Sequence, residues 1–97
     1  MARKKPPKGW TEGSVRDLLD LSDDEAAIVE MRVRLAENVR EKRRARRVTQ
    51  KELARRIQST QPRIARLEQA DASIEMLIRA LFALGSDRKE IGKLLAA

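Results

Sequence analysis

One stretch of twenty residues, TQKELARRIQSTQPRIARLE at positions 49–68, constrains the fold more than any other part of this chain. Its apolar residues recur at the spacing that places them on one face of a helix, first in one half of the stretch and then in the other. They are Leu53, Ala54, Ile57, Ile64 and Leu67. Between the halves, the hydroxyls of Ser59 and Thr60 can accept hydrogen bonds from the backbone N–H groups that open a helix. The spacing predicts two short helices joined by a tight turn, with the small Ala54 at their close crossing.

The segment before this stretch is predicted to be one long helix, over residues 23–47. Ser22 with a glutamate three residues later, at Glu25, has the pattern of a capping box. The helix then carries an apolar stripe with spacings of three and four residues. The stripe consists of Ile28, Met31, Leu35 and Val39. Thr49, with Glu52 three residues on, has the pattern that starts the next helix.

Two more helices are predicted after residue 73. One covers 74–84 and ends at Gly85, and the other begins at Asp87, with Glu90 again at the distance of a capping box. No segment shows the alternation of a strand. We therefore expect an all-α fold of five or six short helices, with an N-terminal helical extension.

The first nine residues, MARKKPPKG, differ in composition from the rest of the chain. They combine two prolines and a glycine with four cations, which is typical of a disordered basic arm. A chain of 97 residues with 41% hydrophobic residues can build one compact core. We expect a single domain over residues 10–97, with 10–24 as the N-terminal extension and 25–97 as the core.

The charge of the chain is concentrated where the two short helices are predicted. The formal net charge is +7, and residues 38–68 hold eleven basic and three acidic residues. Such a basic segment is the electrostatic footprint of a protein that binds phosphate groups, and two short helices joined by a tight turn can place one helix in a DNA major groove. The alternative for any of these cations is a solvated surface position.

The composition also argues against several classes of function. The chain contains no cysteine and no histidine, which removes disulfides, the commonest metal ligands and the usual general base, so we expect no enzyme, no metal and no cofactor. No apolar run approaches the roughly 20 residues that cross a bilayer. We expect a cytoplasmic protein that does not bind membranes.

Residues 35–84 resemble the helix-turn-helix family of lambda-type phage repressors and xenobiotic-response-element (XRE) regulators, through TQKELA, a turn and TQPRIARLE. Over residues 9–94 the chain is also similar to small antitoxins of the HigA type, which share GW, GSV, LS followed by acids, and a helix like LIRALFALG. The resemblance implies a lambda repressor-like domain of a prokaryote that binds a palindromic operator in double-stranded DNA as a homodimer. For an antitoxin it further implies repression of its own operon and neutralisation of a small basic toxin, a ribonuclease of the RelE/HigB type.

The resemblance also implies roles for individual residues. The second helix of the motif would read bases, since glutamine pairs with the edge of adenine and arginine with that of guanine. The candidates for base contacts are Thr60, Gln61, Arg63 and Arg66. The candidates for phosphate contacts are Gln50, Lys51, Arg55 and Ser59, with Arg63 as a further one. Arg43 and Glu68 match a structural ion pair of the family.

Two positions depart from the family pattern. Gln58 stands where the family usually has glycine, at a turn that tends to need a left-handed backbone. Pro62 occupies a common base-reading position and has no donor to offer, and it disfavours helical geometry at Gln61. A base contact by Arg66 is therefore favoured over one by Gln61.

The sequence leaves the partners open. The candidate dimer surfaces are the N-terminal segment or the last helix, through Ile91, Leu94 and Leu95, whose alternative role is packing in the core. Trp10 either packs on Leu18 and Leu19 or enters a partner protein. Besides an antitoxin, the alternatives are a repressor of the XRE family without a toxin, and a module on the same fold that binds protein or RNA.

Overall fold

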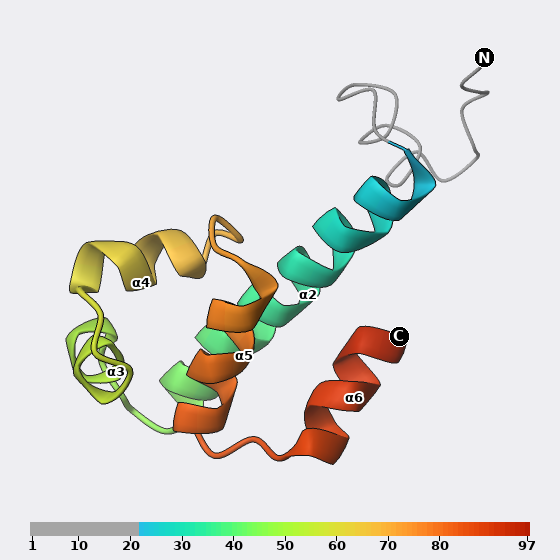
Figure 1. Cartoon of the computed structure of the whole chain (residues 1–97). Coiled ribbons are helices and arrows are strands. Elements are labelled where there is room, and N and C mark those ends of the chain that lie inside the picture. Colours follow the sequence, from blue (N-terminus) through green and yellow to red (C-terminus); the bar gives the residue numbers. More distant parts are fainter. Residues whose placement is uncertain (1–21) are drawn as a thin grey trace. The chain divides into compact units, whose positions relative to one another are not determined.

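The computed structural model describes residues 22–97, and its regular secondary structure is entirely helical over this range. The helices are α2 (Asp23–Ala45), α3 (Gln50–Arg56), α4 (Gln61–Leu67), α5 (Ile74–Ala83) and α6 (Arg88–Ala96) (Figure 1). The predicted all-α class is confirmed. The basic arm at 1–9, Trp10 and the extension up to residue 21 lie outside the described residues.

The chain divides into two compact units, residues 1–30 and 31–97. In the first unit, α2 begins with the predicted capping box. The Glu25 backbone N–H donates to Ser22 Oγ at 3.2 Å, and the Ser22 N–H donates to the Glu25 carboxylate at 3.0 Å. Ile28, the first residue of the apolar stripe of this helix, is 40% exposed. The stripe is fully buried only at Leu35 and Val39, both in the second unit.

The core of the second unit collects apolar side chains from α2, α3, α4 and α5, and Ile91 of α6 joins it. α3 packs against both α4 and α5. Ala54, on α3, is only 3% exposed, in line with the close crossing predicted from its small side chain. The largest fully buried side chains are Leu35, Val39, Leu53, Ile64, Leu67, Leu77, Leu81 and Leu84.

The helices α3, α4, α5 and α6 each begin with a capping side chain. Thr49, Thr60, Ser73 and Asp87 all have extended backbones and accept a hydrogen bond from the N–H three residues on. Only Asp87 forms the complete capping box of these four, because the Glu90 carboxylate accepts from the Asp87 N–H at 3.1 Å. Glu52 does not reciprocate with Thr49, since its carboxylate is bound by Arg55 and Arg56.

The ends of α2, α3, α4 and α5 share one backbone motif. In each, two successive N–H groups after the helix bond back to carbonyls three and five residues earlier, which is the Schellman arrangement. The first of these two residues has a left-handed backbone, with φ between 56° and 97°. These four residues are Arg47, Gln58, Ala70 and Gly85. Only one of them is a glycine. The left-handed backbone of Gln58 is the one that the family pattern led us to expect, whereas the residue types of Arg47 and Ala70 give no such signal.

The C-terminal helix is fastened to α2 by a polar cluster. Lys42 Nζ, on α2, lies 2.8 Å from Ser86 Oγ and 3.2 Å from a carboxylate oxygen of Glu90. Ser86 is only 6% exposed. The Asp87 N–H and the Lys42 ammonium both bind the Glu90 carboxylate and hold the pKa of Glu90 below its ordinary value. The same glutamate thus caps α6 and ties it to α2.

Candidate nucleic-acid interface

A buried ion pair joins the C-terminal end of α2 to that of α4. The Arg43 guanidinium binds both carboxylate oxygens of Glu68, with its Nη2 at 3.1 Å from Oε1, and donates from Nη1 to the carbonyl of Val48 at 2.9 Å. The two side chains are 12% and 4% exposed. Burial alone would raise the pKa of Glu68, but the hydrogen bonds from Arg43 and Gln50 and the positive charge of Arg43 outweigh burial and lower it.

The ion pair continues as a chain of hydrogen bonds to the start of α4. Gln50 Nε2 donates to Glu68 Oε1 at 3.0 Å, and Gln61 Nε2 donates to Gln50 Oε1 at 2.7 Å. Gln61 is the first residue of α4. The side chains of Arg43, Glu68 and Gln50, in series, therefore orient the Gln61 amide at the beginning of this helix. The Gln61 carbonyl oxygen and its second amide hydrogen remain available on an exposed side chain, and one acceptor beside one donor is what the edge of adenine pairs with.

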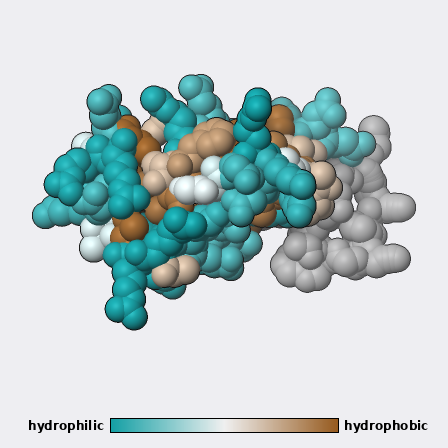
Figure 2. Space-filling model, turned by 90° about the horizontal axis from the view of Figure 1, so that it is seen from below, coloured by the Kyte–Doolittle hydropathy of each residue, from teal (hydrophilic) through white to brown (hydrophobic). Residues whose placement is uncertain are grey.

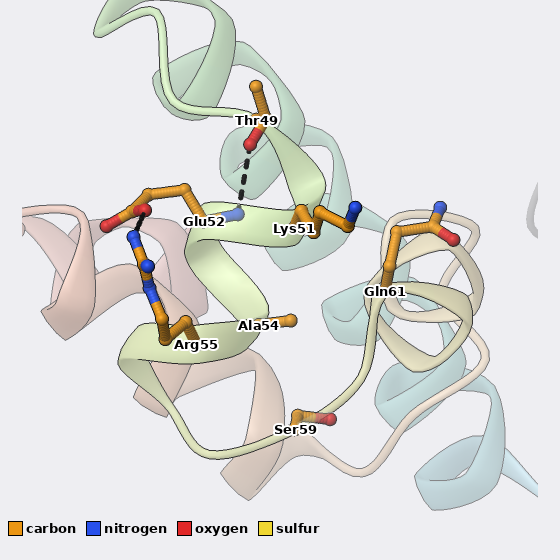
Figure 3. A pocket seen from close by; sticks show the side chains of 7 residues that line it. All are labelled: Thr49, Lys51, Glu52, Ala54, Arg55, Ser59 and Gln61. Carbon is orange, nitrogen blue, oxygen red and sulfur yellow. Dashed lines mark hydrogen bonds and ion pairs between the residues drawn. The ribbon is translucent and has the colours of Figure 1, made fainter.

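A groove of about 500 Å³ lies between α3 and the start of α4. Figure 3 shows the side chains of Lys51, Ala54 and Ser59 directed from α3 and the turn toward the side where Gln61 begins α4. Glu52 and Arg55 lie together on the other side of this view, joined by an ion pair. The groove therefore carries one exposed ammonium, from Lys51, beside the oriented amide of Gln61.

The exposed face of α4 carries a row of side chains one turn apart. Pro62 and Arg66 follow at i and i+4 on this helix, and Gln69 lies in the turn directly after it; all three are exposed. Arg63 and Arg66 line a second groove of about 200 Å³, on which Asp71 also lies. Neither arginine forms an ion pair within residues 22–97. The N–H groups of both guanidinium groups on this helix are therefore available to a ligand.

Figure 2 shows one face of the molecule, on which hydrophilic side chains cover most of the end formed by the two short helices. Apolar areas are exposed between them. α3 and α4 together carry Lys51, Arg55, Arg56, Arg63 and Arg66 against the single acid Glu52. An excess of guanidinium and ammonium groups around a short exposed helix suits a phosphate backbone.

A family model described as a helix-turn-helix domain matches residues 18–89. The chain belongs to this helix-turn-helix family. Comparison with curated proteins and with solved structures gives no match. In the helix-turn-helix of this chain α3 is the first helix, α4 the second, and residues 57–60 are the turn. Its all-α architecture is that of a lambda repressor-like DNA-binding domain, as predicted from the sequence.

The helix-turn-helix places the predicted base-contacting residues at the start and along the exposed side of α4. Thr60 caps the helix through its hydroxyl, and Gln61 is held by Gln50. Arg63 extends from the first turn of the helix and Arg66 from the second. Pro62 was expected to disfavour helical geometry at Gln61, yet α4 begins at Gln61. The extended residue that precedes the helix is Thr60, with φ −123° and ψ 156°. Base contact by these residues stays a prediction.

The predicted phosphate contacts of the helix-turn-helix are less uniform. Gln50 is engaged between Glu68 and Gln61, and Lys51 is exposed at the groove. The Arg55 guanidinium is bound to Glu52, so a phosphate must compete with this carboxylate. The Ser59 hydroxyl is buried and has no hydrogen-bond partner among residues 22–97, so a phosphate contact there requires its side chain to rotate.

Sequence reasoning missed two features of this site. Gln69 was not considered, although it is exposed in the turn directly after α4. The pairing of Glu52 with Arg55 and Arg56 was also missed, since Glu52 was interpreted as half of a capping box. The spacings of three and four residues between these charges were the available signal.

The predicted dimer residues on α6 are not equally accessible. Ile91 is 5% exposed and belongs to the core of the unit itself, so it has little surface to offer a second chain. Leu94 and Leu95 are partly buried against the same core. The dimer stays a prediction, with these two leucines as the part of α6 that is still exposed.

Within residues 22–97, no helix is both long and apolar enough to cross a membrane. The same part of the chain contains no cluster of acidic side chains that could hold a metal ion.

Proposed function

We propose that this chain is a sequence-specific transcription regulator whose α4 reads bases in the DNA major groove. The observation that carries the proposal is the series of hydrogen bonds from Arg43 through Glu68 and Gln50 to Gln61. An amide that is oriented before binding loses less conformational entropy when it pairs with a base than a mobile one does. The series ends on the first residue of α4, where a base-reading side chain is needed.

The roles of the other residues follow from their positions. Arg66 lies on the face of α4 that would enter the groove and is suited to the O6 and N7 atoms of guanine, and Gln69 follows in the turn just beyond the helix. Lys51 on α3 and Arg63 on α4 would contact the phosphate backbone. Arg55 joins them when a phosphate displaces Glu52.

We infer that the regulator binds a palindromic operator as a homodimer. One helix of seven residues covers only a few base pairs, and two-fold symmetry repeats its contacts one helical turn along the duplex. Leu94 and Leu95 of α6 are the proposed contact between the two copies.

The resemblance to HigA-type antitoxins extends the proposal to a prokaryotic cytoplasmic antitoxin of the XRE type. In this role the chain represses its own operon and neutralises a small basic toxin of the RelE/HigB type. The test is to express the neighbouring gene with and without this chain. We expect growth arrest by the toxin alone and rescue by the antitoxin. Absence of arrest, or arrest without rescue, leaves a repressor without a toxin.

DNA binding is tested by selecting sites from a random duplex library and measuring affinities for the selected site and a scrambled one. The salt concentrations are about 50 and 200 mM, a range in which phosphate contacts weaken strongly. Arg66→Ala is the variant, and Arg88→Ala on α6 is the matched control.

We expect the wild type and Arg88→Ala to prefer the selected site by well over tenfold, and Arg66→Ala to lose about 1 to 3 kcal/mol of that preference. Loss of the preference at one base-pair position would assign Arg66 to that position. Equal and weak binding to both duplexes by the wild type contradicts the proposal.

A further inference from the structure

Phe82 is one of only two aromatic residues in the chain and is 48% exposed near the end of α5. It lies on a groove of about 410 Å³ between the ends of α3 and α5. The groove is lined by Arg56, Ile57, Gln58, Arg79, Phe82 and Ala83. An exposed aromatic side chain on a groove is a position where apolar area can be buried by a partner.

The charged groups on this groove are two guanidinium groups, and no acid lines it. Arg56 is already engaged: its Nη1 donates to the Ala83 carbonyl at 3.2 Å and its Nε to a Glu52 oxygen at 3.3 Å. Arg79 precedes Phe82 by almost one helical turn and has no ion-pair partner among residues 22–97. The groove therefore offers one unpaired guanidinium beside an apolar surface.

The groove is separate from the proposed DNA-binding surface. It shares no lining residue with the groove between α3 and α4, and none of its residues belongs to α4. A molecule bound at Phe82 therefore leaves Gln61, Arg66 and Lys51 accessible to DNA.

We propose that this groove docks an acidic segment of a partner protein that carries an apolar side chain next to a carboxylate. The apolar side chain packs on Phe82 and Ile57. The carboxylate binds Arg79 in the bidentate geometry that arginine favours. Phenylalanine and arginine are both enriched in protein interfaces. The inference is independent of the proposed function, since it concerns a different surface.

Two other occupants fit the groove less well. A second copy of this chain, related by a two-fold axis at Phe82, would place Arg56 and Arg79 of both copies close together, and their like charges repel. A nucleic acid strand presents a row of phosphates, whereas Arg79 is the one lining cation without a partner among residues 22–97. A single carboxylate matches this groove better.

The test uses the full chain and a display library of random twelve-residue peptides. Peptides enriched on the wild type are synthesised, their affinities are measured, and the bound site is mapped from backbone amide shifts in NMR spectra. The variants are Phe82→Ser and Arg79→Glu, with Arg88→Glu on α6 as the matched control. Thermal unfolding of each variant shows whether it is folded. If Phe82→Ser is not folded, Arg79→Glu alone serves as the test variant.

We expect enriched peptides with acidic and apolar residues side by side, shifts at Arg79 and Phe82, and binding that is at least about tenfold weaker in both variants, a change of about 1.4 kcal/mol. The control and added duplex DNA should leave this binding unchanged. The proposal is overturned by peptides without acids, by shifts elsewhere, by equal binding to Arg79→Glu, by self-association at Phe82, or by tighter binding of a single-stranded oligonucleotide at this groove.

Discussion

Gln58 holds a left-handed backbone, with φ 56°, in the turn of the helix-turn-helix. A residue with a Cβ pays about 1 to 2 kcal/mol in this region relative to glycine, while glycine costs roughly 0.5 to 1 kcal/mol more to order. We expect Gln58→Gly to stabilise the protein by about 0.5 to 1 kcal/mol. The measurement is the midpoint of urea unfolding.

Gln69→Gly is the matched control for this substitution. Gln69 is also an exposed glutamine at a helix end, but it lacks a positive φ. Glycine there brings only its entropic cost, so we expect a small loss of stability. If both variants change stability in the same direction, strain at Gln58 is not the cause.

The ion pair between Arg43 and Glu68 is the most buried charged contact of the site. Replacing one partner leaves the other charge stranded, whereas replacing both by apolar residues removes the desolvation cost as well. We expect Arg43→Met to cost about 3 kcal/mol of unfolding free energy, and the double variant Arg43→Met/Glu68→Leu to cost less. Chemical denaturation of the three proteins checks this order.

The same pair has a second consequence for DNA binding. Without Glu68, Gln50 loses the acceptor that positions it, and Gln61 loses its indirect support. The double variant should therefore bind the selected operator more weakly even where it remains folded. Unchanged affinity would show that Gln61 is oriented by DNA itself.

At the scale of the helix, α6 depends on its N-terminal capping box. Asp87 accepts from the Glu90 N–H at 2.9 Å, and its own N–H is bound by Glu90, which also meets Lys42. Loss of a capping side chain typically costs about 1 kcal/mol, so we expect Asp87→Ala to lower the free energy of unfolding by that amount and the urea midpoint with it.

Asp71→Ala provides the control for α6. Asp71 is an exposed acid that caps no helix and forms no ion pair within the described part of the chain. Its replacement should leave the midpoint nearly unchanged. A similar loss in both variants would point to net charge rather than to the cap.

The helix stops show how a local pattern can be incomplete. The starts of α3, α4, α5 and α6 were visible as threonine, serine or aspartate at the right spacing, because these side chains bond to a backbone N–H three residues away. The stops at Arg47 and Ala70 carry no such signal. Their left-handed backbones accompany the hydrogen bonds of the Schellman arrangement, which satisfy the last carbonyls of each helix.

For the whole molecule, stability should depend on pH through the glutamates. Glu52, Glu68 and Glu90 all have a pKa below the ordinary value of 4.5. Near that pH the unfolded chain binds more protons than the folded one, so stability is fully present above about 4.5 and is lost as pH falls through the lowered values. Urea midpoints between about pH 6 and pH 3 should fall, and fall less in the double variant Arg43→Met/Glu68→Leu.

Binding of the whole protein to DNA should be limited by Glu52, whose carboxylate holds Arg55 and Arg56. We expect Glu52→Gln to tighten binding to any duplex and to steepen the dependence of log affinity on log salt by about one unit, since one more cation reaches a phosphate. Titrations at several salt concentrations measure this slope.

Glu75→Gln is the control for net charge, because Glu75 is an exposed acid on α5 outside the two DNA-binding helices. Its replacement changes the total charge equally but leaves Arg55 bound to Glu52. An equal effect of both variants would mean that Glu52 acts through the overall charge only.

The sequence by itself determined the helical class, the start of each described helix and the positions of the two DNA-binding helices. These features depend on spacings of three and four residues and on caps, all of which are local in the chain. The tertiary structure decided which charges are engaged. The bonds of Gln50 to Glu68 and of Gln61 to Gln50 join residues 18 and 11 positions apart, and the exposure of Phe82 depends on how α3 and α5 meet. No local spacing encodes such contacts, because they form only when the helices pack on one core.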